Sequence, residues 1–222
     1  MGLVLGILLA LWLEPLANIA GPVPEYNANT IGPVSSWGPY VPGWGGAPEH
    51  HITAQPLTLV LCWLAGTIVG IGLGELLIRF RRRHPGMSTR RFVLIFIVAC
   101  TLTTNLQAPL FFALGFVRWS RGIDGLTLWP GTWHQFPLYE TVGFTVLMLG
   151  LVGFYYWSRT RGPHFLQPAA PPCPRRLGEA VPILAVIGVV NTVMLSYVAF
   201  MALAGQLATI TVTELPAFWS TP

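Results

Sequence analysis

The sequence predicts an all-α integral membrane protein, a single membrane domain over residues 1–222 with a bundle of about five transmembrane helices and a Pro/Gly/Trp-rich extracytoplasmic loop. Of the 222 residues, 53% are hydrophobic and only 9% are charged, whereas about 25% of the residues of a soluble globular domain are charged. The mean hydropathy is +0.61. Four stretches are apolar for about 20 residues or more, which is the length that crosses a bilayer. This composition excludes an ordinary soluble enzyme, a disordered chain and a nucleic-acid-binding module.

Four of the predicted helices coincide with these apolar stretches. They extend over residues 57–79, 92–117, 138–157 and 180–207. A fifth apolar run, residues 2–13, corresponds to about 18 Å of helix, which is too short to cross a bilayer. We expect a retained helix that continues to residue 20, because the run lacks the basic start and the small residues before a cleavage site that are typical of a signal peptide.

The arginines predict how the helices cross the membrane. The chain has no lysine, and ten of its twelve basic residues lie in or beside two connections, residues 80–91 and 158–179. Because loops rich in positive charge stay in the cytoplasm, both connections are expected there. The N-terminus is then cytoplasmic, the C-terminus and the loop at 21–56 are extracytoplasmic, and the protein is a multi-pass protein of a bacterial cell membrane. The net charge of +4 is explained by this orientation signal, so no nucleic-acid partner is expected.

The outer loop at 21–56 is rich in proline and glycine, which predicts turns and irregular structure rather than a helix or a sheet. Its Trp37 and Trp44 suit the membrane interface, where one edge of the ring meets water. The loop is either an extracytoplasmic segment anchored by aromatic side chains or a lid over an intramembrane cavity. Adjacent residues such as His50 and His51 cannot both point at one ion in regular structure, so no metal site is expected.

Polar side chains inside a membrane span cost free energy and normally face a cavity or a partner. Glu14 and Asn18 come first; a spacing of four residues places them on one face if the first helix continues. Pro15 would bend the helix and aim the carboxyl and the amide into the bundle near its outer side. Alternatively, the helix ends at Glu14 and both residues lie in water.

A second polar group surrounds the predicted start of the fourth helix. Pro137 can begin this helix, and Glu140 follows in its first turn, where the helix dipole favours a negative charge. That position alone would explain Glu140. However, His134, Gln135 and Tyr139 lie within the same seven residues at the outer membrane boundary, and such a density of polar groups is more typical of the mouth of a site.

Two amides and one carboxyl lie deeper in the predicted spans. Asn105 and Asn191 are midway along their helices, where an amide commonly hydrogen-bonds across helices for about 0.6 kcal/mol. We expect this structural role for Asn191, whereas Asn105 could hold either a helix or a substrate. Glu75 lies one turn before Arg79 near the cytoplasmic end of its helix, and a local ion pair between the two is expected.

The helix that carries Glu75 also has a stripe of small residues. Gly66, Gly70 and Gly74 recur at four-residue spacing along it. Such a stripe lets the backbone of another helix approach closely. The sequence therefore predicts a tight helix contact along this face.

Several of these residues together resemble a known family. The series is Trp12-x-Glu14-Pro15-x-x-Asn18, Tyr26-Asn27, Ser36-Trp37 and Pro42-Gly43-Trp44, followed by Gln135-Phe136-Pro137-Leu138-Tyr139-Glu140. It resembles the AveC-type spirocyclases, a family of actinobacterial membrane proteins. The resemblance implies a membrane-embedded enzyme that closes a dihydroxyketone polyketide into a spiroketal, in some members with a further dehydration.

Spiroketal closure needs a proton donor for the hemiketal hydroxyl, which leaves as water, and an anion beside the oxocarbenium ion that results. A carboxyl buried in an apolar cavity can stay protonated and act as the acid, while a better solvated carboxylate supplies the negative charge. Glu14 and Glu140 are the candidates for this pair, in either assignment. The candidates for contacts with a lipophilic substrate are Asn18, Asn105, Gln135, Tyr139, Trp37, Trp44 and His134. No cofactor is expected, and the other partners are membrane lipids.

Two other functions fit the same residues. A membrane terpenoid or meroterpenoid cyclase would use similar acids, together with an aromatic lining for carbocations; this lining could come from Phe111, Phe112, Trp133 and Phe136. A non-enzymatic membrane or transport subunit would need no acid pair.

Overall fold

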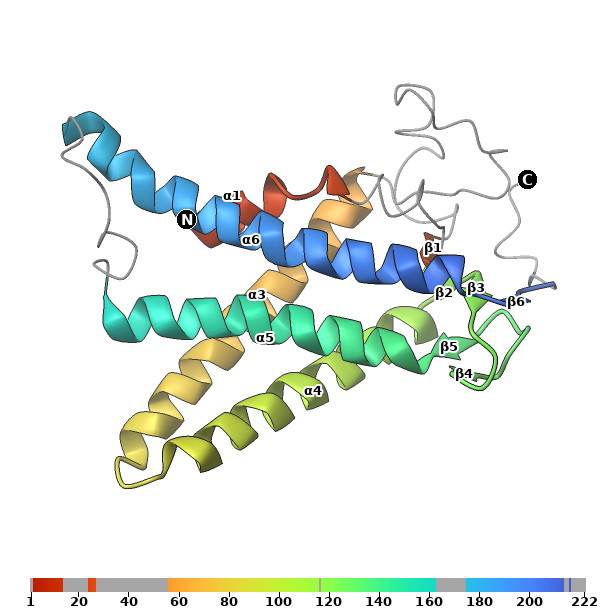
Figure 1. Ribbon diagram of the computed structural model, residues 1–222, viewed down its shortest axis with the longest axis horizontal. Helices are drawn as coiled ribbons and strands as arrows, with labels where there is room; N and C mark the ends of the chain where they lie inside the picture. Colours follow the sequence, from red (N-terminus) through yellow and green to blue (C-terminus); the bar gives the residue numbers. More distant parts are fainter. Residues whose placement is uncertain are drawn as a thin grey trace.

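The fold is given by a computed structural model, which describes residues 2–13, 24–26, 56–115, 117–162, 175–213 and 216. Within these residues the chain forms five helices, joined at one end by short strands (Figure 1). The helices are α1 (Gly2–Leu8), α3 (Pro56–Arg83), α4 (Thr89–Ala113), α5 (Leu138–Arg161) and α6 (Arg175–Gln206). Each of α3 to α6 is long and apolar enough to cross a membrane. The prediction of a helical protein is therefore confirmed, and four of the predicted spans coincide with helices of membrane-spanning length and apolarity.

The helix α1 differs from the expectation. A regular helix was expected over residues 2–20, but α1 ends at Leu8 and turns follow as far as Trp12. The amide of Ala10 donates to the carbonyl of Ile7, and the amide of Leu13 donates to that of Ala10. Such bonds over three residues tighten the last turns of a helix. The rest of the expected helix, residues 14–20, lies outside the described residues.

The long helices extend beyond the apolar runs at their arginine-bearing ends. The helix α3 continues to Arg83 and α5 to Arg161, while α6 begins at Arg175. Arginine is a good helix former whose long side chain reaches water from a buried stem, so the helix does not stop where the hydropathy falls. At the other end, α4 stops at Ala113, and Gly115 adopts a positive φ of 68°, which is common just after a helix.

The glycine stripe of α3 forms the predicted close contact. A Cβ atom at Gly74 would lie 2.5 Å from the ring of Tyr155 on α5, and one at Gly66 would lie 3.3 Å from the amide of Gln107 on α4. Gly70 lies in ordinary contact with α5. Because α5 also packs on α4 and α6, it is the helix that holds the bundle together (Figure 1).

The short helix α1 runs parallel to α6. Gly2 faces Val186, and Gly6 faces Val190; a Cβ atom at Gly6 would lie 3.0 Å from the side chain of Val190. The amide of Asn191 on α6 donates to the carbonyl of Ile187, and its Oδ1 accepts a hydrogen bond of 3.1 Å from the indole of Trp12. The structural role predicted for Asn191 is confirmed, since this amide joins α6 to the segment that follows α1.

Within the described residues, three two-stranded antiparallel sheets cap the end of the bundle opposite the arginine-bearing ends (Figure 1). They pair β1 (Pro24–Tyr26) with β2 (Val117–Trp119), β3 (Arg121–Gly122) with β6 (Ile210–Thr211), and β4 (Thr127–Leu128) with β5 (Phe136–Pro137). The strand β1 corrects the expectation that the loop at 21–56 would contain no sheet. Its partner is more than ninety residues away in the chain, so the local composition could not predict the pairing.

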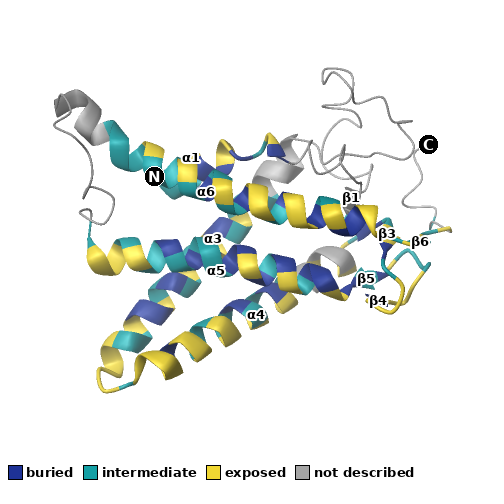
Figure 2. Ribbon diagram, in the orientation of Figure 1, coloured by how far each residue is buried: buried dark blue, intermediate teal, exposed yellow. Residues whose placement is uncertain are grey.

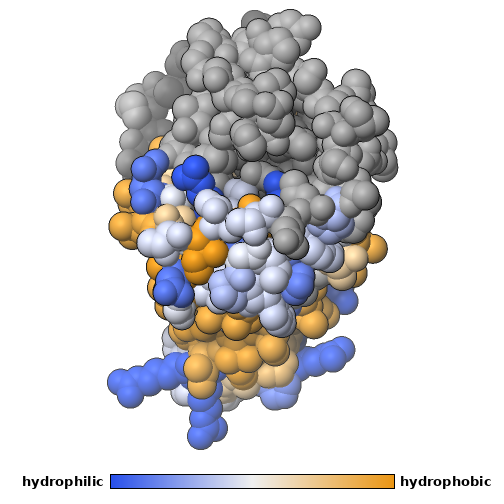
Figure 3. Space-filling model, turned by 90° about the vertical axis from the view of Figure 1, so that its right-hand side faces the viewer, coloured by the Kyte–Doolittle hydropathy of each residue, from blue (hydrophilic) through white to orange (hydrophobic). Residues whose placement is uncertain are grey.

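Buried and exposed residues divide as a bilayer requires. Large apolar side chains such as Ile68 and Leu106 are exposed, and exposed residues occur along all four long helices (Figure 2). In a bilayer, lipid would cover such side chains. Seen from the strand end, hydrophilic and intermediate side chains face the viewer and hydrophobic ones lie around and below them (Figure 3). The strand end is therefore the polar cap of an apolar body.

Candidate functional site

Glu140 is buried where α5 begins, directly under the capping strands. Pro137 precedes the helix in an extended conformation with φ −75° and ψ 119°, and Glu140 is the acidic residue of the first turn. Only 4% of its surface is exposed. A carboxyl is rarely buried to this extent without a specific partner. The predicted site residue therefore lies inside the molecule rather than on a solvated helix end.

One partner of Glu140 comes from α6. The hydroxyl of Tyr197 donates a hydrogen bond of 2.7 Å to Oε1 of Glu140. The ring of Tyr197 lies against that of Phe144, with the two centroids 5.9 Å apart. Sequence reasoning missed Tyr197, because it searched the spans for carboxyls and amides and passed over phenols. A tyrosine hydroxyl within a span is itself a signal, since it also needs a partner in an apolar medium.

The surroundings of Glu140 are mostly apolar and aromatic. Tyr139 and Trp119 form a buried cluster with Met201 and Ala204 of α6, and Tyr197 packs against this cluster. The hydroxyl of Tyr139 is buried and accepts or donates no hydrogen bond among the described residues. Sequence reasoning did not single out Trp119. The cluster keeps water away from the carboxyl and carries one phenol whose hydrogen-bonding capacity is unused within the described structure.

Gln135 has both ends of its amide engaged by the backbone. It is fully buried, its Nε2 donates to the carbonyl of Trp119 at 2.8 Å, and its Oε1 accepts from the amide of Gly131 at 3.0 Å. These bonds fasten the turn before β5 to β2. The structure thus gives Gln135 a role in shaping the cap, and its predicted contact with a substrate stays a prediction.

Asn105 and His134 contact residues other than Glu140. The Oδ1 of Asn105 accepts a hydrogen bond of 3.3 Å from Thr141, the residue after Glu140, and its amide donates to the carbonyl of Thr101. Asn105 therefore links α4 to α5. His134 is exposed on the cap, where its ring lies between those of Trp129 and Trp133. The contacts described for the two side chains do not include Glu140, and their substrate contacts stay predictions.

Arg118 was not singled out from the sequence, but the structure buries it. It is the central residue of β2, and the strand register places it opposite Glu25 of β1. Its position directly after an apolar run was the available signal. A guanidinium at this depth brings positive charge to the same cap that contains Glu140.

The remaining predicted site residues lie outside the described structure. They are Glu14, Asn18, Trp37 and Trp44. His50 and His51, which were not expected to bind a metal, also lie outside it. The backbone of Phe111 and Phe112 belongs to α4, but their side chains are not described. The chain reaches Glu14 through Leu13, which is fully buried. Leu13 belongs to a cluster that includes Val198, the residue next to Tyr197.

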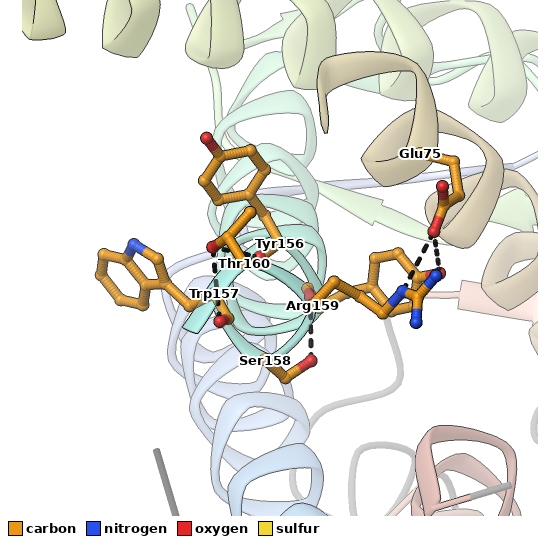
Figure 4. A network of polar contacts seen from close by, with 7 residues as sticks. Glu75, Tyr156, Trp157, Ser158, Arg159 and Thr160 are labelled. Carbon is orange, nitrogen blue, oxygen red and sulfur yellow. Dashed lines mark hydrogen bonds and ion pairs between the residues drawn. The ribbon is translucent and has the colours of Figure 1, made fainter. Parts of the chain in front are cut away.

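Glu75 of α3 lies against the other end of α5 and has different partners from the one expected. Its Oε1 accepts hydrogen bonds from the hydroxyl of Tyr155 at 2.7 Å and from Nε of Arg159 at 3.2 Å (Figure 4). The direct ion pair of Glu75 is thus with Arg159 rather than with Arg79, because α5 approaches α3 closely at Gly74 and brings its own donors to the carboxylate. The charge of Arg79 still acts on this carboxylate from a longer distance.

Comparison with known proteins gave one finding. A family model described as "Spirocyclase AveC-like" matches residues 2–222. No curated protein and no solved structure matches the chain.

Proposed function

The chain belongs to the AveC-like spirocyclase family, and from this premise we propose that it is a membrane-embedded cyclase that forms a spiroketal from a lipophilic dihydroxyketone. The family implies a cyclase in polyketide biosynthesis. In the proposed reaction one hydroxyl adds to the ketone, the hemiketal hydroxyl leaves as water, and the second hydroxyl attacks the oxocarbenium carbon and loses its proton. The sum is a dihydroxyketone converted to a spiroketal and one water, with no change in oxidation state.

The observation that carries this proposal is the buried carboxyl of Glu140. It lies in the first turn of α5, 4% exposed, beneath a cap of strands and beside an aromatic cluster. The start of a helix stabilises negative charge, and a carboxylate in a water-poor site stabilises a developing cation far better than it would in water. Burial alone would favour the neutral acid, but the hydrogen bond that Tyr197 donates and the position in the first turn of α5 both favour the charged form. We therefore assign Glu140 the carboxylate that faces the oxocarbenium ion.

The proton donor is proposed to be Glu14. Two features of the described residues support this assignment. Leu13, which directly precedes Glu14, is fully buried in the cluster that contains Val198, and Val198 is adjacent to the partner of Glu140. A proton donor and a carboxylate in different surroundings are the arrangement that acid-assisted loss of water needs.

The neighbouring groups suit a lipophilic, oxygen-bearing substrate. Trp119 and Met201 offer apolar contact, and the buried hydroxyl of Tyr139 has unused hydrogen-bonding capacity among the described residues. A buried polar group of this kind lowers the cost of burying a ketone or hydroxyl of the substrate. Tyr139 is therefore proposed to bind one of the reacting oxygens.

The site is proposed to lie on the extracytoplasmic side, with the N-terminus in the cytoplasm. The cap lies opposite the arginine-bearing helix ends, and α1 runs parallel to α6, as this orientation requires. Labelling of intact cells with a membrane-impermeant maleimide tests it. Leu126→Cys in the cap should react and His84→Cys between α3 and α4 should not; the reverse pattern would invert the orientation.

The function itself is tested with purified protein in nanodiscs and a lipophilic dihydroxyketone, with product chirality followed by chiral chromatography and mass spectrometry. We expect one spiroketal epimer from the native protein and the spontaneous epimer ratio from empty nanodiscs and from Glu140→Gln. If Glu140→Gln still gives the single epimer, Glu140 has no role in the chemistry. If the native protein gives the spontaneous ratio, the spirocyclase function is wrong for this substrate class.

A terpenoid cyclase is the second candidate, because aromatic side chains surround Glu140. Trp119 and Phe136 belong to or pack against the cluster beside it, and aromatic faces stabilise carbocations. Incubation with a polyprenyl epoxide that carries no diphosphate group would reveal this activity through formation of a cyclic alcohol. Absence of turnover on both substrates would favour a non-enzymatic membrane subunit.

A further inference from the structure

The hydroxyl of Tyr197 makes the described hydrogen bond that connects Glu140 to another transmembrane helix. It donates to Oε1 over 2.7 Å, from α6 to α5, between residues 57 positions apart in the chain. We propose that Tyr197 is a positioning residue: it fixes the orientation of the Glu140 carboxylate so that its charge faces the reacting carbon. This inference rests on the proposed function and adds to it a residue from a different helix.

The ring of Tyr197 is itself held in place, which a positioning residue requires. It packs against the apolar clusters on both sides of it, and its centroid lies 5.9 Å from that of Phe144. The two helices are close at this level because Gly143 has no side chain. A Cβ there would lie 2.7 Å from Phe200 and 3.5 Å from Tyr197. The hydroxyl therefore has little freedom to move away from the carboxylate.

A fixed donor has a clear effect on a buried carboxylate. In water, a rotating carboxylate exchanges hydrogen bonds freely, but in a buried site a rotation that breaks a hydrogen bond costs more free energy because water does not replace it. A hydrogen bond to a charged acceptor is about twice as strong as a neutral one and defines the plane of the carboxylate. Charge that is already oriented need not reorganise when the cation forms, and this lowers the barrier.

The chain provides a matched control for this bond. Tyr155 donates to Oε1 of Glu75, also over 2.7 Å, at the opposite end of α5. Replacement of either tyrosine by phenylalanine removes one hydroxyl from one tyrosine–glutamate pair and keeps the ring. Any general effect of losing such a bond from the bundle is therefore common to both variants.

The first readout separates kcat from KM for the cyclisation. We expect Tyr197→Phe to lower kcat about tenfold and to change KM less than about twofold, because positioning acts on the transition state. Tyr155→Phe should change neither. An unchanged kcat in Tyr197→Phe would overturn the proposal, and so would a raised KM at constant kcat, since the hydroxyl would then bind substrate.

The second readout needs no substrate. The protein has only eight acidic residues, so infrared bands of the Glu140 carboxyl can be identified by their loss in Glu140→Gln. We expect Tyr197→Phe to shift these bands and Tyr155→Phe to leave them in place. Bands unchanged by Tyr197→Phe would overturn the proposal. If the bands shift but the native protein forms no single epimer, the positioning of Glu140 stands and the proposed reaction fails.

Discussion

The two ends of α5 carry the same chemical pair in opposite surroundings. At the capped end, Tyr197 donates to Glu140; at the arginine-bearing end, Tyr155 donates to Glu75, and both bonds are 2.7 Å long. Glu140 is 4% exposed, whereas the side chains of Glu75 and Arg159 are 29% and 61% exposed. Solvent screens the Tyr155–Glu75 pair at the arginine-bearing end, here called the inner pair. It scarcely reaches the Tyr197–Glu140 pair at the capped end, here called the outer pair. The hydrogen bond alone therefore does not indicate function; the burial of the carboxyl does.

The largest effect is expected from moving the outer carboxylate. Glu140→Asp withdraws it by one methylene from Tyr197, and a displacement of about 1 Å can cost about 100-fold in rate. In the Glu140→Asp background, Tyr197→Phe should add less than about a twofold loss, because the two residues act as a unit. Single-turnover kinetics on the four proteins measures this. A further tenfold loss would show that Tyr197 acts independently.

Two glycine substitutions compare the ends through packing. Gly143→Ala places a Cβ 2.7 Å from Phe200 beside the outer pair, and Gly74→Ala places one 2.5 Å from Tyr155 in the inner pair. Each overpacked contact should cost about 1–3 kcal/mol of stability. Only Gly143→Ala should also lower turnover. Thermal unfolding and the epimer assay check both effects, and equal activity losses in the two variants would contradict the distinction between the ends.

An effect on stability but not on turnover is expected from a hydrogen bond in the first half of α5. Thr104 of α4 and Thr145 of α5 share a buried hydrogen bond of 3.1 Å. Thr104→Val should leave the hydroxyl of Thr145 without this partner and cost about 1–3 kcal/mol. Turnover per folded molecule should not change, because the pair lies more than one helical turn from Glu140 along α5. A loss of turnover without a loss of stability would extend the site along the helix.

The smallest effect belongs to the inner ion pair. Arg159→Gln removes the exposed guanidinium from Glu75 and should shift the unfolding midpoint by no more than about 2 °C, less in high salt, with unchanged activity. Calorimetry in nanodiscs at two salt concentrations measures this shift. A large, salt-independent shift would mean that Glu75 and Arg159 are as protected from solvent as Glu140 is.

Sequence patterns predicted what depends on long or local regularities. The apolar runs located α3 to α6, and the spacing of Gly66, Gly70 and Gly74 indicated a close helix contact. The helix ends were less predictable, because α3 continues through its arginines to Arg83 where hydropathy has already fallen. Glutamate 140 was identified as a candidate from its polar neighbours, but its degree of burial depends on the cap above it.

The missed features all depend on which distant segments of the chain meet. Glu75 has Arg79 at a suitable local spacing, yet its partners come from α5 because Gly74 admits that helix. Tyr197 lies 57 residues from Glu140, and β1 pairs with a strand much further along the chain. No local period encodes such contacts, since they arise from tertiary packing.

The most direct test of this account compares Glu140→Gln with Glu75→Gln in the same nanodiscs. Each substitution removes the charge of one glutamate that accepts a hydrogen bond from a tyrosine, Glu140 at the capped end of α5 and Glu75 at the arginine-bearing end. With a lipophilic dihydroxyketone, we predict the spontaneous epimer ratio from Glu140→Gln and the single epimer of the native protein from Glu75→Gln. A single epimer from Glu140→Gln, or its loss in Glu75→Gln alone, would contradict the assignment of the catalytic carboxylate to the capped end.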